Sequence, residues 1–423
     1  MEYLEFELKL GEARDGAYPV DVLRSPAGEQ RGVMRLAGSA DELRILQESL
    51  EASLRSTRTA ARDLGRDDDQ QLGNYDAASV QRYGRMLFES ALCGDVATCF
   101  RTSRALARAA QPPKGLRIRL RTDDPALAQL PWELMYDATE GEYLTLSAET
   151  PLVRHLELGR AVPPLAMRRP LRILGMVARP ADLATLHVDP ERERMQQALD
   201  PLLRSGDIHL QWIAGENSRS LRQALQPGAG PWHVFHFIGH GGFSSAEGEG
   251  VLMLRGENAR AEELPASHLG RILGDHPSLR LTVLNACEGA RGSAANVFSS
   301  TAATLMRRGL PAVIAMQNPI SDPGAIEFSR EFYTALARGL PVDTAVAEGR
   351  KAVSLASARG FEWVTPVLHM RAADGQLFDL SPDPAEQQAA AFPELPGTSK
   401  KSRLVFALLL GSLLLAYVIY ALI

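Results

Sequence analysis

The stretch that decides the fold is Trp232–Ile238, an apolar run that leads into Gly239-His240-Gly241-Gly242. A second apolar run, Leu281–Leu284, leads in the same way into Asn285-Ala286-Cys287-Glu288-Gly289. Each run is typical of a buried strand that opens into a tight loop containing glycine. Parallel strands of an α/β sheet end at one edge, and such sheets bind their ligands at that edge. The sequence therefore predicts that an imidazole and a thiol meet there.

An imidazole beside a thiol is the arrangement that a cysteine hydrolase needs. A thiol with a pKa of about 8.5 is mostly protonated at neutral pH, and a neighbouring imidazole activates it by accepting the proton. We expect the Cys287 thiolate to attack a peptide carbonyl and His240 to protonate the leaving amine. The oxyanion that develops needs backbone N–H donors, for which Gly241 and Cys287 form the natural pair.

The same residues also permit less specific interpretations. A single cysteine at the end of a strand is more often a packing residue, and a single histidine is usually structural. His236 and His240 resemble a metal-binding pair, but the glycines around them disfavour a helix. On a strand the two residues lie roughly 13 Å apart, too far to share one ion. We therefore expect no metal and no cofactor, and we interpret His236 as a packing residue behind the site.

Composition excludes several other classes of protein. The 423 residues are 45% hydrophobic, which is enough for a large core and predicts two domains. Mixed charges with a net charge of −5 argue against a nucleic-acid partner. Three cysteines are too few, and odd in number, for a disulfide scaffold. A nucleotide-binding protein is disfavoured because no Walker A or G-x-G-x-x-G motif follows a strand.

From Leu171 onward, strands are expected to alternate with helices, which predicts an α/β fold with a mostly parallel sheet and helices on both faces. The expected strands are Leu171–Val177, His209–Ile213, Val234–Ile238, Leu281–Leu284, Ala312–Met316 and Trp363–Leu368. The expected helices lie near Glu191–Leu203, Ala266–Leu273, Val297–Arg308, Ala325–Ala337 and Val342–Ala358.

The sequence before this region predicts a small N-terminal β/α region, residues 1–79. Alternating apolar and polar residues up to about position 38 indicate short antiparallel strands. A capping box at Ser39-Ala40-Asp41-Glu42 then opens a helix. We expect a further helical stretch from about Val80 to Ala110, at the start of a main domain that spans residues 80–375. Residues 376–403 follow as a flexible linker.

Residues 404–423 contain no charged side chain, and a helix of this length spans roughly 30 Å, the thickness of a bilayer core. Lys400, Lys401 and Arg403 stand directly before it, so the positive-inside rule keeps the preceding residues in the cytoplasm. No signal peptide is visible at the start of the chain. The sequence predicts a single-pass C-terminal anchor in the cell inner membrane, with the catalytic domain in the cytoplasm.

Several motifs in order resemble one family. The segments Phe235–Gly241 and Leu284–Glu288 are similar to the histidine and cysteine motifs of CHAT domains, relatives of caspases and separases. Leu130-Pro131-Trp132-Glu133-Leu134 resembles the Pro-Trp-Glu-Leu signature of that family, and Pro151–His155 resembles the segment after it. The resemblance covers roughly residues 80–375 and implies a caspase-like fold with His240 and Cys287 as a catalytic dyad.

By the same resemblance, Asn285 and Met316, Gln317 and Asn318 would line the pocket for the residue before the scissile bond. The family implies a protein substrate, an activating protein partner, and a role in bacterial signalling, defence or regulated cell death. No arginine is placed to carry over the aspartate preference of caspases. The leading interpretation is thus a membrane-tethered cysteine endopeptidase. The alternative is a catalytically silent scaffold that keeps the fold to bind proteins.

Overall fold

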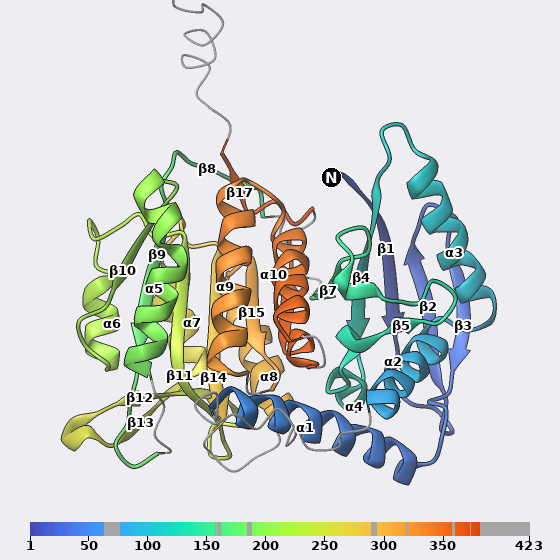
Figure 1. Cartoon of the computed structure of the whole chain (residues 1–423), viewed down its shortest axis with the longest axis horizontal. Coiled ribbons are helices and arrows are strands. Elements are labelled where there is room, and N and C mark those ends of the chain that lie inside the picture. Colours follow the sequence, from blue (N-terminus) through green and yellow to red (C-terminus); the bar gives the residue numbers. More distant parts are fainter. Residues whose placement is uncertain are drawn as a thin grey trace, which may run out of the picture. The chain divides into compact units, whose positions relative to one another are not determined.

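The apolar runs of the sequence form the central strands of one large sheet. The computed structural model describes residues 1–62, 77–156, 158, 162–183, 188–288, 294–318, 320–357, 360–372 and 374–380. Residues Met1–Asp379 form one compact unit. Within the described residues its main sheet has 13 strands, in the order β10-β9-β11-β14-β15-β16-β7-β4-β1-β2-β3, with β12 and β13 attached beside β11 (Figure 1).

One half of this sheet contains the two motif-bearing strands. Its strands are β9 (Leu171–Val177), β10 (Ile208–Trp212), β11 (Val234–Ser244), β14 (Leu281–Glu288), β15 (Ala312–Met316) and β16 (Pro366–Met370), together with β12 (Glu249–Arg255) and β13 (Ala261–Pro265). The five strands from β10 to β15 are parallel, whereas β16 pairs antiparallel with β15. The carboxyl ends of β11 and β14 therefore lie at the same edge of the sheet.

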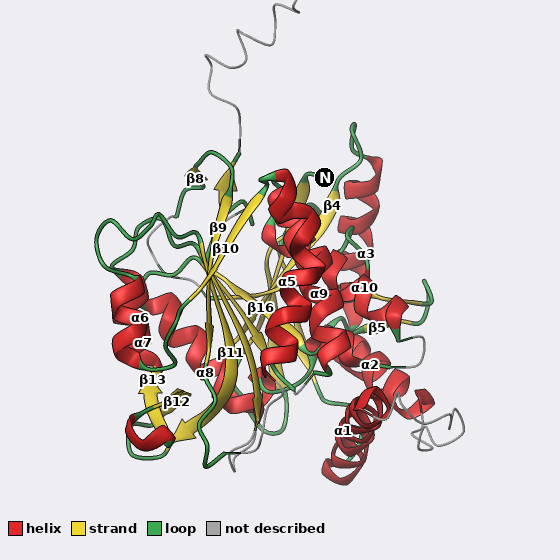
Figure 2. Cartoon of the chain, turned by 60° about the vertical axis from the view of Figure 1, so that its left-hand side comes forward, coloured by secondary structure: helices red, strands yellow, loops and turns green. Residues whose placement is uncertain are grey.

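Helices cover both faces of this half. Figure 2 shows α5 (Val188–Ser205), α9 (Asp322–Ala337) and α10 (Val342–Ala356) on one face, and α6 (Ser218–Ala224), α7 (Ala266–Gly274) and α8 (Ala294–Arg307) on the other. A hydrophobic cluster that includes Leu174, Phe235 and Leu284 is fully buried. These side chains come from neighbouring strands. Every second residue of a strand faces the same side of the sheet, so the apolar side chains gather on one face. The predicted mostly parallel sheet with helices on both faces is confirmed.

The N-terminal strands extend this same sheet. Its second half contains β7 (Leu152–His155), β4 (Gly115–Thr122), β1 (Tyr3–Leu10), β2 (Tyr18–Arg24) and β3 (Gln30–Met34). β1 pairs antiparallel with β2, as the sequence predicts, but its other edge pairs in parallel with β4. Two short pairs lie outside the main sheet: β5 (Tyr136–Asp137) with β6 (Glu142–Tyr143), and β8 (Leu165–Ala166) with β17 (Phe378–Asp379).

The N-terminal helices are α1 (Ala40–Arg62), α2 (Ala77–Ala91), α3 (Gly94–Ala109) and the short α4 (Pro125–Ala128). The predicted cap of α1 is present, because the Glu42 backbone N–H donates to Ser39 Oγ at 3.1 Å. The single helical stretch expected over residues 80–110 is instead two helices. Leu92 and Cys93 separate them, and α3 begins at Gly94, whose φ of +52° is a left-handed conformation that favours glycine.

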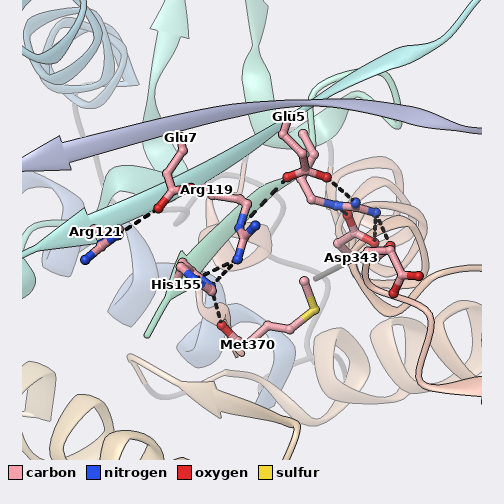
Figure 3. Close-up of polar contacts among 9 residues, drawn as sticks. Glu5, Glu7, Arg119, Arg121, His155, Asp343 and Met370 are labelled. Carbon is pink, nitrogen blue, oxygen red and sulfur yellow. Dashed lines mark hydrogen bonds and ion pairs between the residues drawn. The ribbon is translucent and has the colours of Figure 1, made fainter. Parts of the chain in front are cut away.

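Charged side chains occupy alternate positions of β1 and β4, on one face of the sheet, and connect these strands to neighbouring elements (Figure 3). Arg117 binds Glu5 of β1 at 2.7 Å and Asp343 of α10 at 2.5 Å. Arg119 contacts the ring of His155 on β7 at 2.7 Å. Because Arg117 and Asp343 are almost fully buried, their pairing fixes the N-terminal strands against α10.

Gly84 marks a close approach between α2 and the 3-10 helix η1 (Trp132–Leu134). A Cβ atom at position 84 would lie 2.2 Å from the carbonyl oxygen of Leu134, so one backbone would have to move. We expect Gly84→Ala to lower the free energy of unfolding by roughly 1–3 kcal/mol, the usual cost of overpacking, despite the better helix propensity of alanine. Urea denaturation measures this. Arg82→Ala, at an exposed position of α2, is the control, and equal stability of both variants would contradict the close packing.

The predicted membrane helix at residues 404–423 lies outside the described residues, as does the predicted linker beyond Leu380. Within the described part of the chain, no helix has both the length and the apolar character needed to cross a membrane. The C-terminal anchor therefore stays a prediction from the sequence.

Candidate active site

The two motifs lie side by side in the backbone of the sheet. β11 and β14 pair in parallel from Val234 and Leu281 onward, and this register sets His240 opposite Cys287. Strands so paired are about 4.8 Å apart. Positions 240 and 287, separated by 46 residues of sequence, are thus neighbours at the carboxyl edge of β14. The side chain of Cys287 lies outside what the structure describes.

The expected tight loops after the two apolar runs are wrong in one respect, because both functional positions lie within strands. β9 pairs with β11 only as far as Ile238. From His240 to Ser244, β12 takes the place of β9 and pairs antiparallel with β11. This added partner lets the glycine-containing segment remain extended. β12 begins only five residues after β11 ends and folds back on it as a hairpin, and neither β12 nor β13 was predicted from the sequence.

Close packing accounts for the glycine before the histidine. A Cβ atom at Gly239 would lie 2.6 Å from the ring of Phe237 and 3.2 Å from the carbonyl oxygen of Ala178. The His240 side chain is only 1% exposed. Gly241, the predicted oxyanion donor, follows it in β11 and pairs in register with Glu288 and Leu252. The backbone therefore holds His240 and Gly241 rigidly between two partner strands.

His236 lies on β11, four residues before His240, and is fully buried. Its Nδ1 is 2.7 Å from the hydroxyl of Tyr333 on α9. Burial lowers the pKa of His236 to about 3, so the ring is neutral at physiological pH. The contact with Tyr333 ties the central strand to α9. Within the described residues, no group of three or more His, Cys, Asp or Glu side chains could hold a metal ion.

This buried imidazole predicts a pH dependence of stability. Because the pKa of His236 is depressed by folding from 6.5 to about 3, unfolded chains bind a proton below pH 6.5 that folded chains do not. The contribution of the neutral, buried His236 ring to the free energy of unfolding is complete above pH 6.5 and is lost as the pH falls towards 3. By pH 5 the free energy of unfolding is about 2 kcal/mol lower for this reason. We expect His236→Phe to flatten the plot of unfolding free energy against pH over this range by about one proton.

Urea denaturation between pH 7 and pH 5 measures that slope. Tyr333→Phe is the matched control, because it removes the same hydrogen bond but keeps the imidazole. It should lower stability at every pH and leave the slope unchanged. If His236→Phe keeps the wild-type slope, the imidazole is not buried in its neutral form.

The four predicted pocket residues occupy two neighbouring strand ends. Asn285 is buried on β14, in register with Ile238. Met316 closes β15 and is 2% exposed. Gln317 follows it and is 8% exposed, while Asn318 is partly exposed. The structure thus brings these positions to the same edge as His240, and the side chains of Met316 and Gln317 are largely enclosed by protein.

A buried ion pair, which the sequence analysis did not assign to the site, lies behind this edge. Glu133 of η1 is fully buried and binds Arg154 of β7 through both carboxylate oxygens, at 3.0 and 2.6 Å. Burial opposes the charged form of Glu133, but Arg154 and the nearby Arg350 outweigh it and hold its pKa below the ordinary value. The signal in the sequence was the Pro-Trp-Glu-Leu segment itself, whose glutamate stands among apolar residues.

Several solved structures are distantly similar to this chain. The Saccharomyces cerevisiae separase–securin complex matches with 12% identity and a TM-score of 0.47, covering 87% of this chain and 30% of the separase chain. The Arg-specific cysteine proteinase gingipain R matches with 12% identity and a TM-score of 0.41, covering 79% of this chain and 76% of that chain. The complex of Porphyromonas gingivalis RgpB pro- and mature domains gives 12% identity and a TM-score of 0.42, covering 79% and 78% of the two chains. The chain thus spans less than a third of the separase.

No curated protein matches the chain. A family model does match it: the CHAT domain model covers residues 86–403, well over half of the sequence. The match includes both motif-bearing strands, β11 and β14, and the Pro-Trp-Glu-Leu segment. The chain belongs to the CHAT domain family.

Proposed function

We propose that the protein is a cysteine endopeptidase in which His240 and Cys287 form the catalytic dyad. The observation that supports this most directly is the register of β11 and β14, which pairs these two positions at the carboxyl edge of a parallel sheet. That edge is where α/β sheets place their ligands. Membership of the CHAT family is consistent with the proposal.

In this mechanism the Cys287 sulfur, deprotonated with the help of His240, attacks the carbonyl carbon of the scissile peptide bond. The carbonyl oxygen becomes an oxyanion, which the backbone N–H groups of Gly241 and Cys287 stabilise. As the carbon–nitrogen bond breaks, His240 gives its proton to the leaving amine. Water, deprotonated by His240, then hydrolyses the thioester and restores the free thiol.

A covalent probe tests the proposal. The chain without residues 404–423 is incubated with a peptide library and with a cysteine-directed acyloxymethyl ketone probe. We expect cleavage and labelling of the wild-type chain, and loss of both in His240→Ala. A wild-type chain that neither cleaves nor reacts, even with added lysate to supply a partner, would favour a non-catalytic scaffold.

We further propose that residues 404–423 anchor the protein in the cell inner membrane, with the peptidase domain in the cytoplasm. The basis is the sequence alone: 20 uncharged residues preceded by Lys400, Lys401 and Arg403. Tethering would raise the local concentration of the protein and of any activating protein partner. Membrane fractionation of a reporter fused to residues 400–423 tests this, and a soluble reporter would refute the anchor.

A further inference from the structure

The loop that follows β15, residues 317–321, borders the candidate active site. β14 and β15 are parallel, with Leu284 opposite Ala315. Gln317 stands two residues beyond Ala315, and Ala286 stands two residues beyond Leu284. Extending this register by two residues sets Gln317 beside Ala286, the residue that precedes Cys287. The described residues of the loop are Gln317, Asn318, Ile320 and Ser321.

Other residues of the chain contact both the nitrogen and the oxygen of the Gln317 side-chain amide. Its Nε2 donates to the carbonyl oxygen of Gln129 at 2.8 Å, and its Oε1 lies 3.5 Å from a guanidinium nitrogen of Arg154. Its backbone N–H donates to the carbonyl oxygen of Thr365 at 2.9 Å. These contacts fix the start of the loop and use one Nε2 hydrogen and the Oε1 of the Gln317 amide.

Arg154 in turn fixes the segment that receives Gln317. Besides the two bonds to Glu133, its guanidinium donates to the carbonyl oxygens of Ala128 at 2.5 Å and Leu130 at 2.8 Å. These two residues flank Gln129. Arg154 belongs to β7, in the N-terminal half of the sheet, so a buried bridge connects that half to the loop after β15.

The far end of the loop is also held. The Ser321 backbone N–H and hydroxyl donate to the two carboxylate oxygens of Glu362 at 2.8 and 2.7 Å. Ile320 and Ser321 are 4% and 7% exposed. Among the described residues from Met316 to Ser321, only Asn318 is not buried.

We propose that Glu133 and Arg154, acting through Gln317, are positioning residues that hold this loop so that Asn318 contacts the substrate. The inference rests on the proposed peptidase activity. The amide of Asn318 both donates and accepts hydrogen bonds and has no charge. It suits the backbone of an extended peptide or an uncharged polar side chain near the scissile bond.

The test compares steady-state kinetics of the full-length chain in detergent, on a peptide that the wild-type protein cleaves. We expect Asn318→Ala and Gln317→Met each to raise KM about tenfold, the effect of one or two lost hydrogen bonds, and to leave kcat within about twofold. Arg154→Lys, which cannot form the planar two-pronged contact, should do the same. Arg121→Lys, in a comparable ion pair with Glu7 on β1 and β4, is the matched control and should leave both constants unchanged.

A second measurement separates positioning from general damage. Alkylation of Cys287 by iodoacetamide needs no substrate pocket, so its rate should be the same in Gln317→Met and in wild type. If the wild-type protein is active but Gln317→Met has an unchanged KM, the positioning role alone is overturned. The same holds if the alkylation rate of Gln317→Met falls in step with its cleavage rate. A wild-type chain that cleaves no peptide and resists the ketone probe would overturn the peptidase itself, and this inference with it.

Discussion

Replacing Cys287 by alanine is expected to lower peptide cleavage by a factor on the order of 10⁴ or more, while the protein stays folded. Removing a nucleophile eliminates the covalent route, and only binding and oxyanion stabilisation remain. His240→Ala should have an effect of similar size, and the double variant should be little worse than either one, because the two residues act as a unit. Turnover of the best library peptide, with the rate of probe labelling as a second readout, measures this.

A second cysteine of the chain provides the matched control. Cys93 is partly exposed at the start of α3, where its sulfur lies 3.5 Å from the carbonyl oxygen of Val33. Cys93→Ala removes a partly exposed thiol without touching the paired strands, so it should retain full cleavage and labelling. If Cys93→Ala abolishes labelling and Cys287→Ala does not, the dyad is misassigned.

Local patterns were enough to predict the main strands. Leu171–Val177 and Ala312–Met316 have the predicted bounds as β9 and β15. Both are short, mainly apolar runs that follow a proline, so the nearby sequence predicts where they begin. The order of β11 and β14 in the sheet also followed, because a parallel sheet brings the ends of successive strands to one edge.

One error is local: β11 runs on to Ser244 because β12, which begins five residues later, folds back on it as a hairpin. The other errors arise where residues far apart in the chain pair with each other. The sequence predicted short antiparallel strands near the N-terminus, but it did not predict that the other edge of β1 pairs in parallel with β4, more than 100 residues away. Glu5, one of the polar residues in the alternating pattern of β1, faces the buried Arg117. The role of Glu133 was not predicted either, because a glutamate in an apolar segment does not indicate which cation it pairs with.

Because Glu133 pairs with the buried Arg154, it is the position where we expect a substitution to cause the largest loss of stability. Glu133 is fully buried and is a counter-ion to Arg154 and to Arg350, which is 1% exposed. Burial lowers the pKa of Arg350 to about 10, so this guanidinium is still charged at neutral pH. Glu133→Gln keeps the shape of the side chain but leaves two buried cations without a carboxylate. We expect it to lower the free energy of unfolding by about 3–5 kcal/mol, the usual cost of breaking a buried pair.

Urea denaturation at pH 7 of the chain without residues 404–423 measures this loss, and Glu7→Gln is the matched control. Glu7 forms an equivalent pair with Arg121 at 2.9 Å, but both side chains are partly exposed, so its loss should cost about 1 kcal/mol or less. Adding Arg154→Met to Glu133→Gln should restore part of the stability, because one uncompensated cation is then removed. If Glu133→Gln is no more costly than Glu7→Gln, the pair is not a buried support for the site. The bridge from β7 to Gln317 would then lose its physical basis, because Arg154 would not depend on Glu133 for its position.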